Sequence, residues 1–131
     1  MVKIILITHG SLGASLIETA SAIYSCHDAK EIVNFTVSGK VNLENIENEI
    51  TNSFGKNGTL ILVDGFGGTS SNIALKCAVN RNDVAVICGV NLNMLLAALS
   101  NQAKMNLTDL AAKVMVDGKK AILNATELIK K

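Results

Sequence analysis

The amino-acid sequence predicts an α/β fold, a doubly wound sandwich of four parallel strands with helices on both faces. Three apolar runs, residues 4–7, 60–63 and 84–88, are continuous rather than alternating, which indicates strands that are buried on both faces. Segments with apolar residues at helical spacing lie between these runs. Strands and helices that alternate in this way build one parallel sheet through right-handed crossovers.

The predicted order of the strands in the sheet rests on the character of the second strand. Residues 31–37, from Glu31 to Val37, alternate in part between apolar and polar side chains, which is typical of a half-exposed strand at the edge of a sheet. The flavodoxin-like order 2-1-3-4 places the second strand at an edge.

Five segments carry apolar residues three or four positions apart and are predicted to be helices. They cover residues 12–23, 43–54, 70–80 and 91–101, and a last segment that opens at Asn106 or Thr108 and includes Ile122 and Leu123. Asn42 is the expected N-cap of the second helix, and Gly55 follows its end. We expect one domain, residues 1–131.

Composition excludes several classes of function. The net charge is +1 and only 3% of residues are aromatic, which argues against nucleic acid as a partner. No apolar run approaches the roughly 18 residues of a membrane span. The three cysteines, Cys26, Cys77 and Cys88, are odd in number and lack a CxxC spacing. They indicate reduced thiols, so we expect a cytoplasmic protein.

The chemistry is expected beyond the carboxyl ends of strands 1 and 3. Ligands of such sheets bind where the strand order reverses, and with the order 2-1-3-4 this point lies between these two strands. His9 follows the first strand and Asp64 follows the third, so the two side chains are predicted to face each other. A lone histidine at a strand end is more often structural, and Asp64 is what favours a catalytic role for His9.

The pair suits nucleophilic transfer of a phosphoryl group. An imidazole that is neutral near pH 7 is a competent nucleophile. Asp64 would accept a hydrogen bond from one ring nitrogen of His9, fix the tautomer and leave the lone pair of the other nitrogen free. No cluster of metal ligands is evident, and exchange between two histidines requires no metal, so neither a metal nor a cofactor is expected.

A glycine-rich turn follows Asp64 and opens the next predicted helix. The backbone N–H groups of Gly67, Gly68 and Thr69 are candidates for binding phosphate oxygens. The hydroxyl groups of Thr69, Ser70 and Ser11 are candidates for further donors. Such glycine-rich turns are also common as plain strand-to-helix connections, so this loop is a weak signal by itself.

Two apolar residues beside the predicted site are candidates for a surface that contacts a partner. Phe66 is a large aromatic side chain within the glycine-rich turn, and Leu12 opens the first predicted helix. An exposed aromatic anchor is typical of protein interfaces. Packing of Phe66 against the neighbouring helix is an equally good interpretation. His27 is expected to be a solvated loop residue.

Three stretches together resemble the IIA component of the mannose/fructose/sorbose family of the bacterial phosphoenolpyruvate-dependent sugar phosphotransferase system. They are Thr8–Gly10, Leu62–Asn72 and Gly89–Leu95. The resemblance implies a phosphotransferase with a phosphohistidine intermediate. His9 would accept the phosphoryl group on Nε2 from the phosphocarrier HPr and pass it to a IIB component, with Asp64 bonded to the other ring nitrogen. The membrane would be involved only through the IIC and IID components.

The chain departs from the family pattern at three positions. Ser70 and Asn93 stand where proline is usual, which leaves both loop backbones less restricted. Thr69 stands where serine is usual and keeps the hydroxyl. The resemblance also implies a homodimer in which a C-terminal segment, about residues 119–128, crosses to the partner's sheet as a fifth, antiparallel strand. The residue pattern predicts a helix there, and both interpretations stay open.

Several alternatives to a phosphocarrier for sugar uptake belong to other classes of function. The same fold serves as a phosphorylation-sensing regulatory domain of transcriptional activators, and a related subunit transfers phosphoryl groups to dihydroxyacetone kinase. A flavin or nucleotide binder would need a hydroxyl-rich loop after strand 1 and stacking aromatics. A response-regulator receiver is excluded, because the first strand lacks an acidic pair. The sequence does not encode which sugar is transported.

Overall fold

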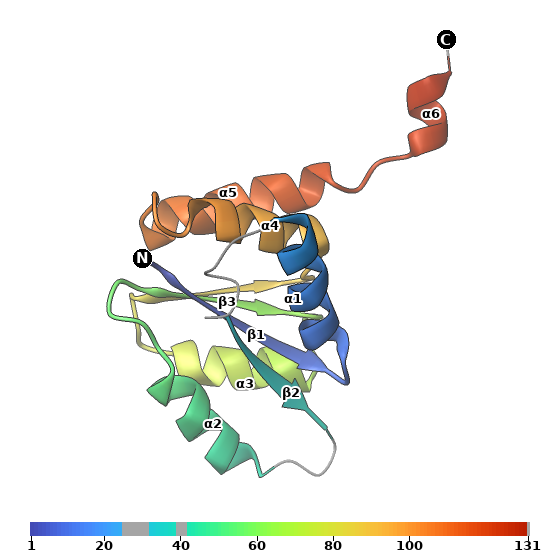
Figure 1. Cartoon of the computed structure of the whole chain (residues 1–131). Coiled ribbons are helices and arrows are strands. Elements are labelled where there is room, and N and C mark those ends of the chain that lie inside the picture. Colours follow the sequence, from blue (N-terminus) through green and yellow to red (C-terminus); the bar gives the residue numbers. More distant parts are fainter. Residues whose placement is uncertain (25–31, 39–41, 131) are drawn as a thin grey trace.

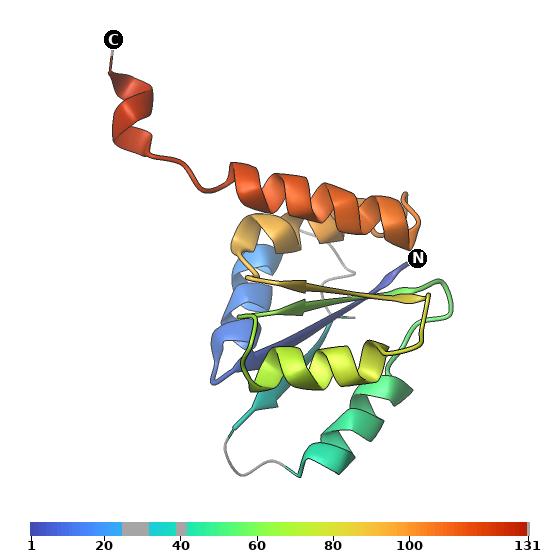
Figure 2. The same ribbon diagram turned by 180° about the vertical axis from the view of Figure 1, so that it is seen from behind.

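The computed structural model describes residues 1–24, 32–38 and 42–130 of the chain. Its core is one parallel sheet in the order β2-β1-β3-β4, which confirms the predicted topology. The strands are β1 (Lys3–His9), β2 (Val33–Val37), β3 (Thr59–Val63) and β4 (Val84–Cys88). Figures 1 and 2 show the sheet between two layers of helices, with α1, α4 and α5 on one face and α2 and α3 on the other.

The two central strands form the most buried part of the molecule. All five residues of β3 are buried, and so are the five residues 4–8 of β1. Successive side chains of β1 enter opposite layers, as the pleat of a strand requires. Ile4 and Leu6 pack with α1, α4 and α5, whereas Ile5 and Ile7 pack against α2 and α3. Burial on both faces explains why these runs are continuously apolar.

The edge position of β2 is confirmed, although Glu31 of the predicted strand lies outside the described residues. Among the described strands, β2 pairs only with β1, in a register that aligns Val33 with Ile5 and Val37 with His9. Cys26 and His27 also lie outside the described residues. Cys77 and Cys88 are free thiols.

The first four predicted helices are confirmed, with small shifts at their ends. The structure has α1 (Leu12–Ile23), α2 (Leu43–Asn52), α3 (Thr69–Ala78), α4 (Leu92–Asn101), α5 (Leu107–Lys120) and α6 (Ala125–Ile129). The side chains of Asn42, Asn91 and Asn106 each accept a hydrogen bond from the third residue of α2, α4 and α5, respectively. These bonds satisfy backbone N–H groups that a helix start leaves unpaired. Asn106 therefore caps the last long helix.

The C-terminal segment differs from the continuous helix that the residue pattern predicts. Helix α5 ends at Lys120, and α6 is a separate short helix capped by Asn124. Figures 1 and 2 show α6 extending away from the rest of the molecule. Ile122 and Ile129 are about 80% exposed, because in a single chain these apolar side chains have no core to pack against. In this single chain the segment forms no strand of the described sheet.

Candidate functional site

His9 and Asp64 meet at the carboxyl ends of the two central strands. His9 is the last residue of β1, and Asp64 directly follows β3. The register pairs Ile7 with Val63, so the two strands end side by side. Asp64 Oδ2 accepts a hydrogen bond from the backbone N–H of His9 at 2.8 Å and lies 2.8 Å from the ring nitrogen Nδ1. The predicted pair is thus brought into direct contact.

The charge on Asp64 is stabilised by this contact. Burial raises the pKa of Asp64, but hydrogen bonds from the His9 ring, the His9 backbone and the Ser70 hydroxyl outweigh it, so the pKa lies below its ordinary value. Asp64 is therefore an anion at neutral pH and acts only as an acceptor. The ring nitrogen Nδ1 must then carry the proton, which leaves the lone pair on Nε2.

Ser70 lies on the same side of the imidazole ring as Asp64. It is in the first turn of α3 and fully buried, and its Oγ is 3.1 Å from His9 Nδ1. Its hydroxyl also contributes to lowering the pKa of the Asp64 carboxyl. Since Nδ1 donates to Asp64, the hydroxyl proton of Ser70 is available to the same carboxylate. Ser70 thus holds Asp64 and His9 together from the α3 side.

The glycine-rich turn is held by bonds that the sequence did not reveal. Gly67 adopts a φ of +88°, a conformation that favours glycine. Its N–H donates to the Ser71 hydroxyl at 2.9 Å, and that hydroxyl donates to the carbonyl of Gly68 at 3.0 Å. The N–H of Gly65 bonds Asp64 Oδ1 at 3.1 Å. The Gly67 N–H is therefore engaged in shaping the loop, and the supporting role of the Ser71 hydroxyl was missed by sequence reasoning.

Gly68 brings the start of α3 up to the imidazole ring. It is the N-cap of α3, and a Cβ atom placed on it would lie 3.9 Å from His9 Cε1. The N–H groups at the start of a helix carry partial positive charge and bind anions. A group attached to the ring of His9 thus lies close to this helix start.

An open hollow of about 320 Å³ surrounds the exposed side of the pair, lined by His9, Asp64, Gly65, Phe66 and Gly68. Phe66 is 82% exposed and does not pack against the neighbouring helix, and Leu12 is 43% exposed. Ser11 and Thr69 are exposed residues at the starts of α1 and α3. Within the described residues, no group of three or more His, Cys, Asp or Glu side chains is placed to hold a metal.

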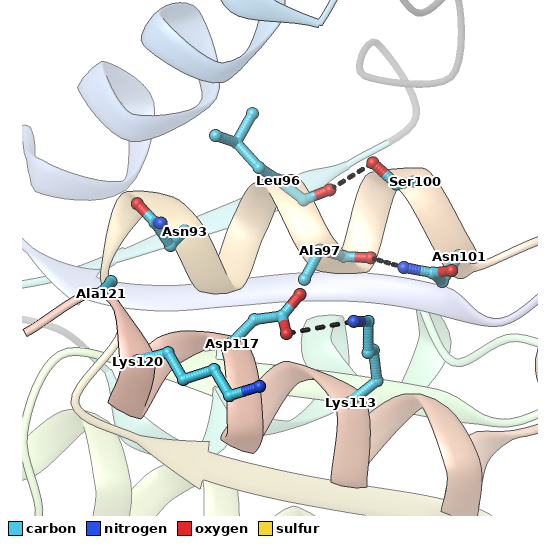
Figure 3. Close-up of a pocket in the computed structure, with 9 residues that line it drawn as sticks. All are labelled: Asn93, Leu96, Ala97, Ser100, Asn101, Lys113, Asp117, Lys120 and Ala121. Atoms are coloured by element: carbon cyan, nitrogen blue, oxygen red, sulfur yellow. Dashed lines mark hydrogen bonds and ion pairs between the residues drawn. The ribbon is translucent and has the colours of Figure 1, made fainter.

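A larger hollow, of about 450 Å³, lies between α4 and α5 and contains none of the predicted site residues (Figure 3). Leu96 and Ala97 line it together with polar side chains of both helices. Lys113 and Asp117, which also line it, form an ion pair at 3.1 Å. None of the residues that line it pairs a histidine with a carboxylate, as His9 and Asp64 do in the smaller hollow.

Comparison with known proteins decides the family. Residues 3–115 match the family described as PTS system fructose IIA component, EIIA-man. The chain belongs to this family. EIIA-man proteins carry phosphoryl groups in the phosphotransferase cascade, and the resemblance seen in the three sequence stretches is confirmed. A comparison with curated proteins returns no match.

Solved structures share the EIIA-man fold. One is phosphotransferase system component EIIA from Streptococcus agalactiae, 22% identical over 97% of this chain and 99% of its own, with a TM-score of 0.86. The mannose/sorbose specific IIA subunit from Enterococcus faecalis is 26% identical over 94% and 93%, with a TM-score of 0.79. A sigma-54 interaction domain protein from Enterococcus faecalis is 15% identical over 99% and 97%, with a TM-score of 0.73. None of the described helices of this EIIA-man chain is long and apolar enough to cross a membrane.

Proposed function

We propose that this chain accepts a phosphoryl group from phosphorylated HPr on Nε2 of His9 and passes it to a IIB component in the cytoplasm. The observation that carries the proposal is the contact between His9 Nδ1 and Asp64 Oδ2 at 2.8 Å. It occupies one ring nitrogen and directs the lone pair to the other. Membership of the EIIA-man family supplies the class of donor and acceptor.

The geometry of His9 and Asp64 supports the following course for transfer of the phosphoryl group. His9 Nε2 attacks the phosphorus atom in line with the bond to the donor histidine, and that bond breaks as the new P–N bond forms. The ring of His9 keeps its Nδ1 proton and becomes positively charged. Asp64, an anion 2.8 Å from Nδ1, stabilises this charge. Transfer to the IIB component reverses the same step.

The start of α3 and two hydroxyl groups are proposed to bind the phosphoryl oxygens. The N–H groups of Gly68 and Thr69 begin α3, and the hydroxyls of Thr69 and Ser11 are on exposed residues at two helix starts. Ser70 takes a different part in this proposal. Because its buried hydroxyl lies at Nδ1 and Asp64, it orients the pair instead of binding the phosphoryl group.

Phe66 and Leu12 are proposed to form part of the surface that both protein partners contact. Phe66 lines the hollow at His9 and is 82% exposed. Burying such a side chain in a partner would contribute substantially to binding. Its position beside the reacting atom fits a contact made with the donor and the acceptor in turn.

A homodimer is proposed from the exposed C-terminal segment. The outer edge of β4 pairs with no described strand, and a cavity of about 200 Å³ beside it is lined in part by Ile87, Met115 and Ile122. Leu128 and Ile129 are 70% and 80% exposed on the projecting α6. A second copy of the chain would cover these apolar side chains, either with the segment as it stands or with the segment as an added strand.

Phosphorylation in a reconstituted cascade tests the proposed function. The purified protein is incubated with phosphoenolpyruvate, enzyme I and HPr, and its intact mass is measured. We expect a single phosphate adduct that is labile in acid, stable in base and absent from His9→Ala. An unmodified wild-type protein beside phosphorylated HPr would contradict the proposal, and so would an adduct that persists in His9→Ala.

A regulatory domain is the second candidate, and the fold of the sigma-54 interaction domain protein favours it. Both functions predict phosphorylation of His9, but only the transport function requires the phosphoryl group to leave for a IIB component. The adduct is therefore isolated and mixed with a mannose-family IIB protein. Loss of the adduct within seconds supports transport, whereas an adduct that persists supports regulation.

A further inference from the structure

Thr8 makes a hydrogen bond that the chemistry proposed above does not use. It precedes His9 in β1, and its side chain is fully buried. Its Oγ1 accepts a hydrogen bond from the backbone N–H of Gly13 at 2.9 Å. Gly13 is the second residue of α1, so this bond ties the first turn of the helix to the end of β1. His9 and the short turn that follows it lie between Thr8 and Gly13 in the chain.

The N-cap residue of α1 does not make the bond that its position offers. A serine at the N-cap usually accepts a hydrogen bond from the second or third residue of the helix. Ser11 has φ −94° and ψ 7°, which is not an extended conformation, and its side chain accepts no capping bond. Thr8 therefore caps α1 from the neighbouring strand. As a result, capping does not occupy the Ser11 hydroxyl, which lies on an exposed residue.

The contact between Thr8 and α1 is closely packed. A Cβ atom on Gly13 would lie 2.6 Å from Thr8 Oγ1 and 2.0 Å from Asn34 Oδ1. Asn34 Oδ1 is buried and accepts no hydrogen bond from the described residues. It is thus an acceptor beside Thr8 that lacks a donor, and the Thr8 hydroxyl has a proton to give. A side chain that both accepts and donates a hydrogen bond suits this position, whereas an aliphatic side chain does not.

We infer that Thr8 is a positioning residue for phosphoryl transfer: its hydroxyl caps α1 in place of Ser11 and so leaves the Ser11 hydroxyl for the phosphoryl group. The inference rests on the proposed function of His9. Without the Thr8 hydroxyl, the Gly13 N–H would be buried without an acceptor, which is costly. Ser11 is the residue that can turn inward to replace it. Its hydroxyl would then be withdrawn from the phosphoryl group.

Thr8→Val tests this inference, because valine keeps the shape and β-branching of threonine and removes only the hydroxyl. We expect the first-order rate constant of transfer from phosphorylated HPr to fall about three- to tenfold, the usual effect of one hydrogen bond. The HPr concentration at half-maximal rate stays unchanged, and Thr8→Ser restores most of the rate. A Thr8→Val protein that transfers at the wild-type rate would overturn the inference.

A double-mutant cycle with Ser11→Ala separates positioning from simple stabilisation. In the wild-type background, we expect Ser11→Ala to lower the rate about three- to tenfold. In the Thr8→Val background it lowers the rate no further, because the hydroxyl has already moved to the cap. If Thr8 were only structural, Thr8→Val and Ser11→Ala would lower the rate independently of each other. Independent effects would therefore overturn the inference.

Thermal unfolding of the wild type, the Thr8→Val and Ser11→Ala variants and the double variant provides a readout that does not depend on activity. Ser11→Ala should lower the melting temperature more in the Thr8→Val background than in the wild type, since only there does Ser11 cap the helix. Equal shifts in both backgrounds would contradict the capping exchange. A wild-type protein that is not phosphorylated at all would instead refute the proposed function, while the unfolding cycle still tests the cap.

Discussion

Asp64 Oδ2 holds His9 at two points, the backbone N–H and the ring nitrogen Nδ1, both at 2.8 Å. The first contact fixes the end of β1, and the second fixes the tautomer of the ring. The side chain of His9 is 54% exposed, whereas that of Asp64 is 16% exposed. At the scale of single residues, the nucleophile is therefore accessible to a partner while the group that orients it is sheltered.

Replacement of Asp64 should slow transfer without unfolding the protein. Asp64→Ala removes the acceptor of Nδ1, so the ring loses its fixed tautomer and the charge of phosphohistidine loses its counterion. We expect the rate of phosphorylation by HPr to fall about ten- to a thousandfold, by analogy with the orienting aspartate of catalytic triads. Stopped-flow measurement with a circular dichroism control checks this, and an Asp64→Ala protein of wild-type rate would contradict the role of Asp64.

The same carboxylate should make stability depend on pH. The pKa of Asp64 is lowered in the folded state, so its stabilising contribution is complete above the unfolded pKa of about 3.9 and is lost as the pH falls through the lower folded pKa. Urea unfolding at a series of pH values should show a steeper acid loss of stability for the wild type than for Asp64→Asn. Parallel curves for the two proteins would show that the contact contributes nothing.

At the scale of elements, much of the fold follows from the sequence. The continuous apolar runs of β1 and β3 predict burial on both faces, and the partial alternation at residues 31–37 predicts the edge position of β2. The meeting of His9 and Asp64 follows from the strand order alone. Asn42 and Asn106 cap their helices by a local rule, so these helix starts are also predictable.

What the sequence did not reveal depends on contacts between distant residues or between hydroxyl groups. The cap that Thr8 provides to α1 joins two elements, and no local rule predicts it. The bond from Gly67 to Ser71 engages an amide that the sequence assigned to phosphate. The break after Lys120 arises because Ile122 and Leu123 have nothing to pack against in one chain, although their spacing fits a helix.

Gly13 offers a test of how tightly α1 is seated on the sheet. Alanine is normally favoured over glycine in a helix, by about 0.5–1 kcal/mol. At Gly13, however, the new Cβ would lie 2.0 Å from Asn34 Oδ1 and 2.6 Å from Thr8 Oγ1. We expect Gly13→Ala to lower the free energy of unfolding by about 1–3 kcal/mol, measured by urea unfolding.

An exposed position of the same helix provides the matched control. Ala14 is exposed, so Ala14→Gly should show the ordinary cost of glycine in a helix, about 0.5–1 kcal/mol. Opposite substitutions at adjacent positions would thus both destabilise the protein. If Gly13→Ala instead stabilised it, the close packing of α1 against Thr8 and Asn34 would be wrong.

At the scale of the whole molecule, the sheet and its two helical layers carry the site at one end, and the C-terminal segment extends away from them (Figure 1). Its large apolar side chains, Ile122, Leu123, Leu128 and Ile129, are all exposed. Such a surface is typical of a segment that a partner covers. The proposed homodimer accounts for it without any change in the site.

Shortening the chain should abolish the proposed dimer. Removal of residues 122–131 takes away the four exposed apolar side chains Ile122, Leu123, Leu128 and Ile129 and leaves α5 complete. We expect the full chain to sediment as a dimer and the shortened chain as a monomer in analytical ultracentrifugation. Lys130→Ala, which removes only an exposed ion pair with Glu127, should remain a dimer. A full chain that sediments as a monomer at high concentration would refute the proposal.

In the proposed mechanism, Asp64 occupies Nδ1 of His9 and leaves Nε2 to carry the phosphoryl group. The most direct measurement is nuclear magnetic resonance of the protein labelled with ¹⁵N in its histidines, before and after phosphorylation by HPr. We expect a proton on Nδ1 of His9 before the reaction and coupling of phosphorus to Nε2 of the same ring afterwards. Coupling of phosphorus to Nδ1, or to a ring other than that of His9, would contradict it.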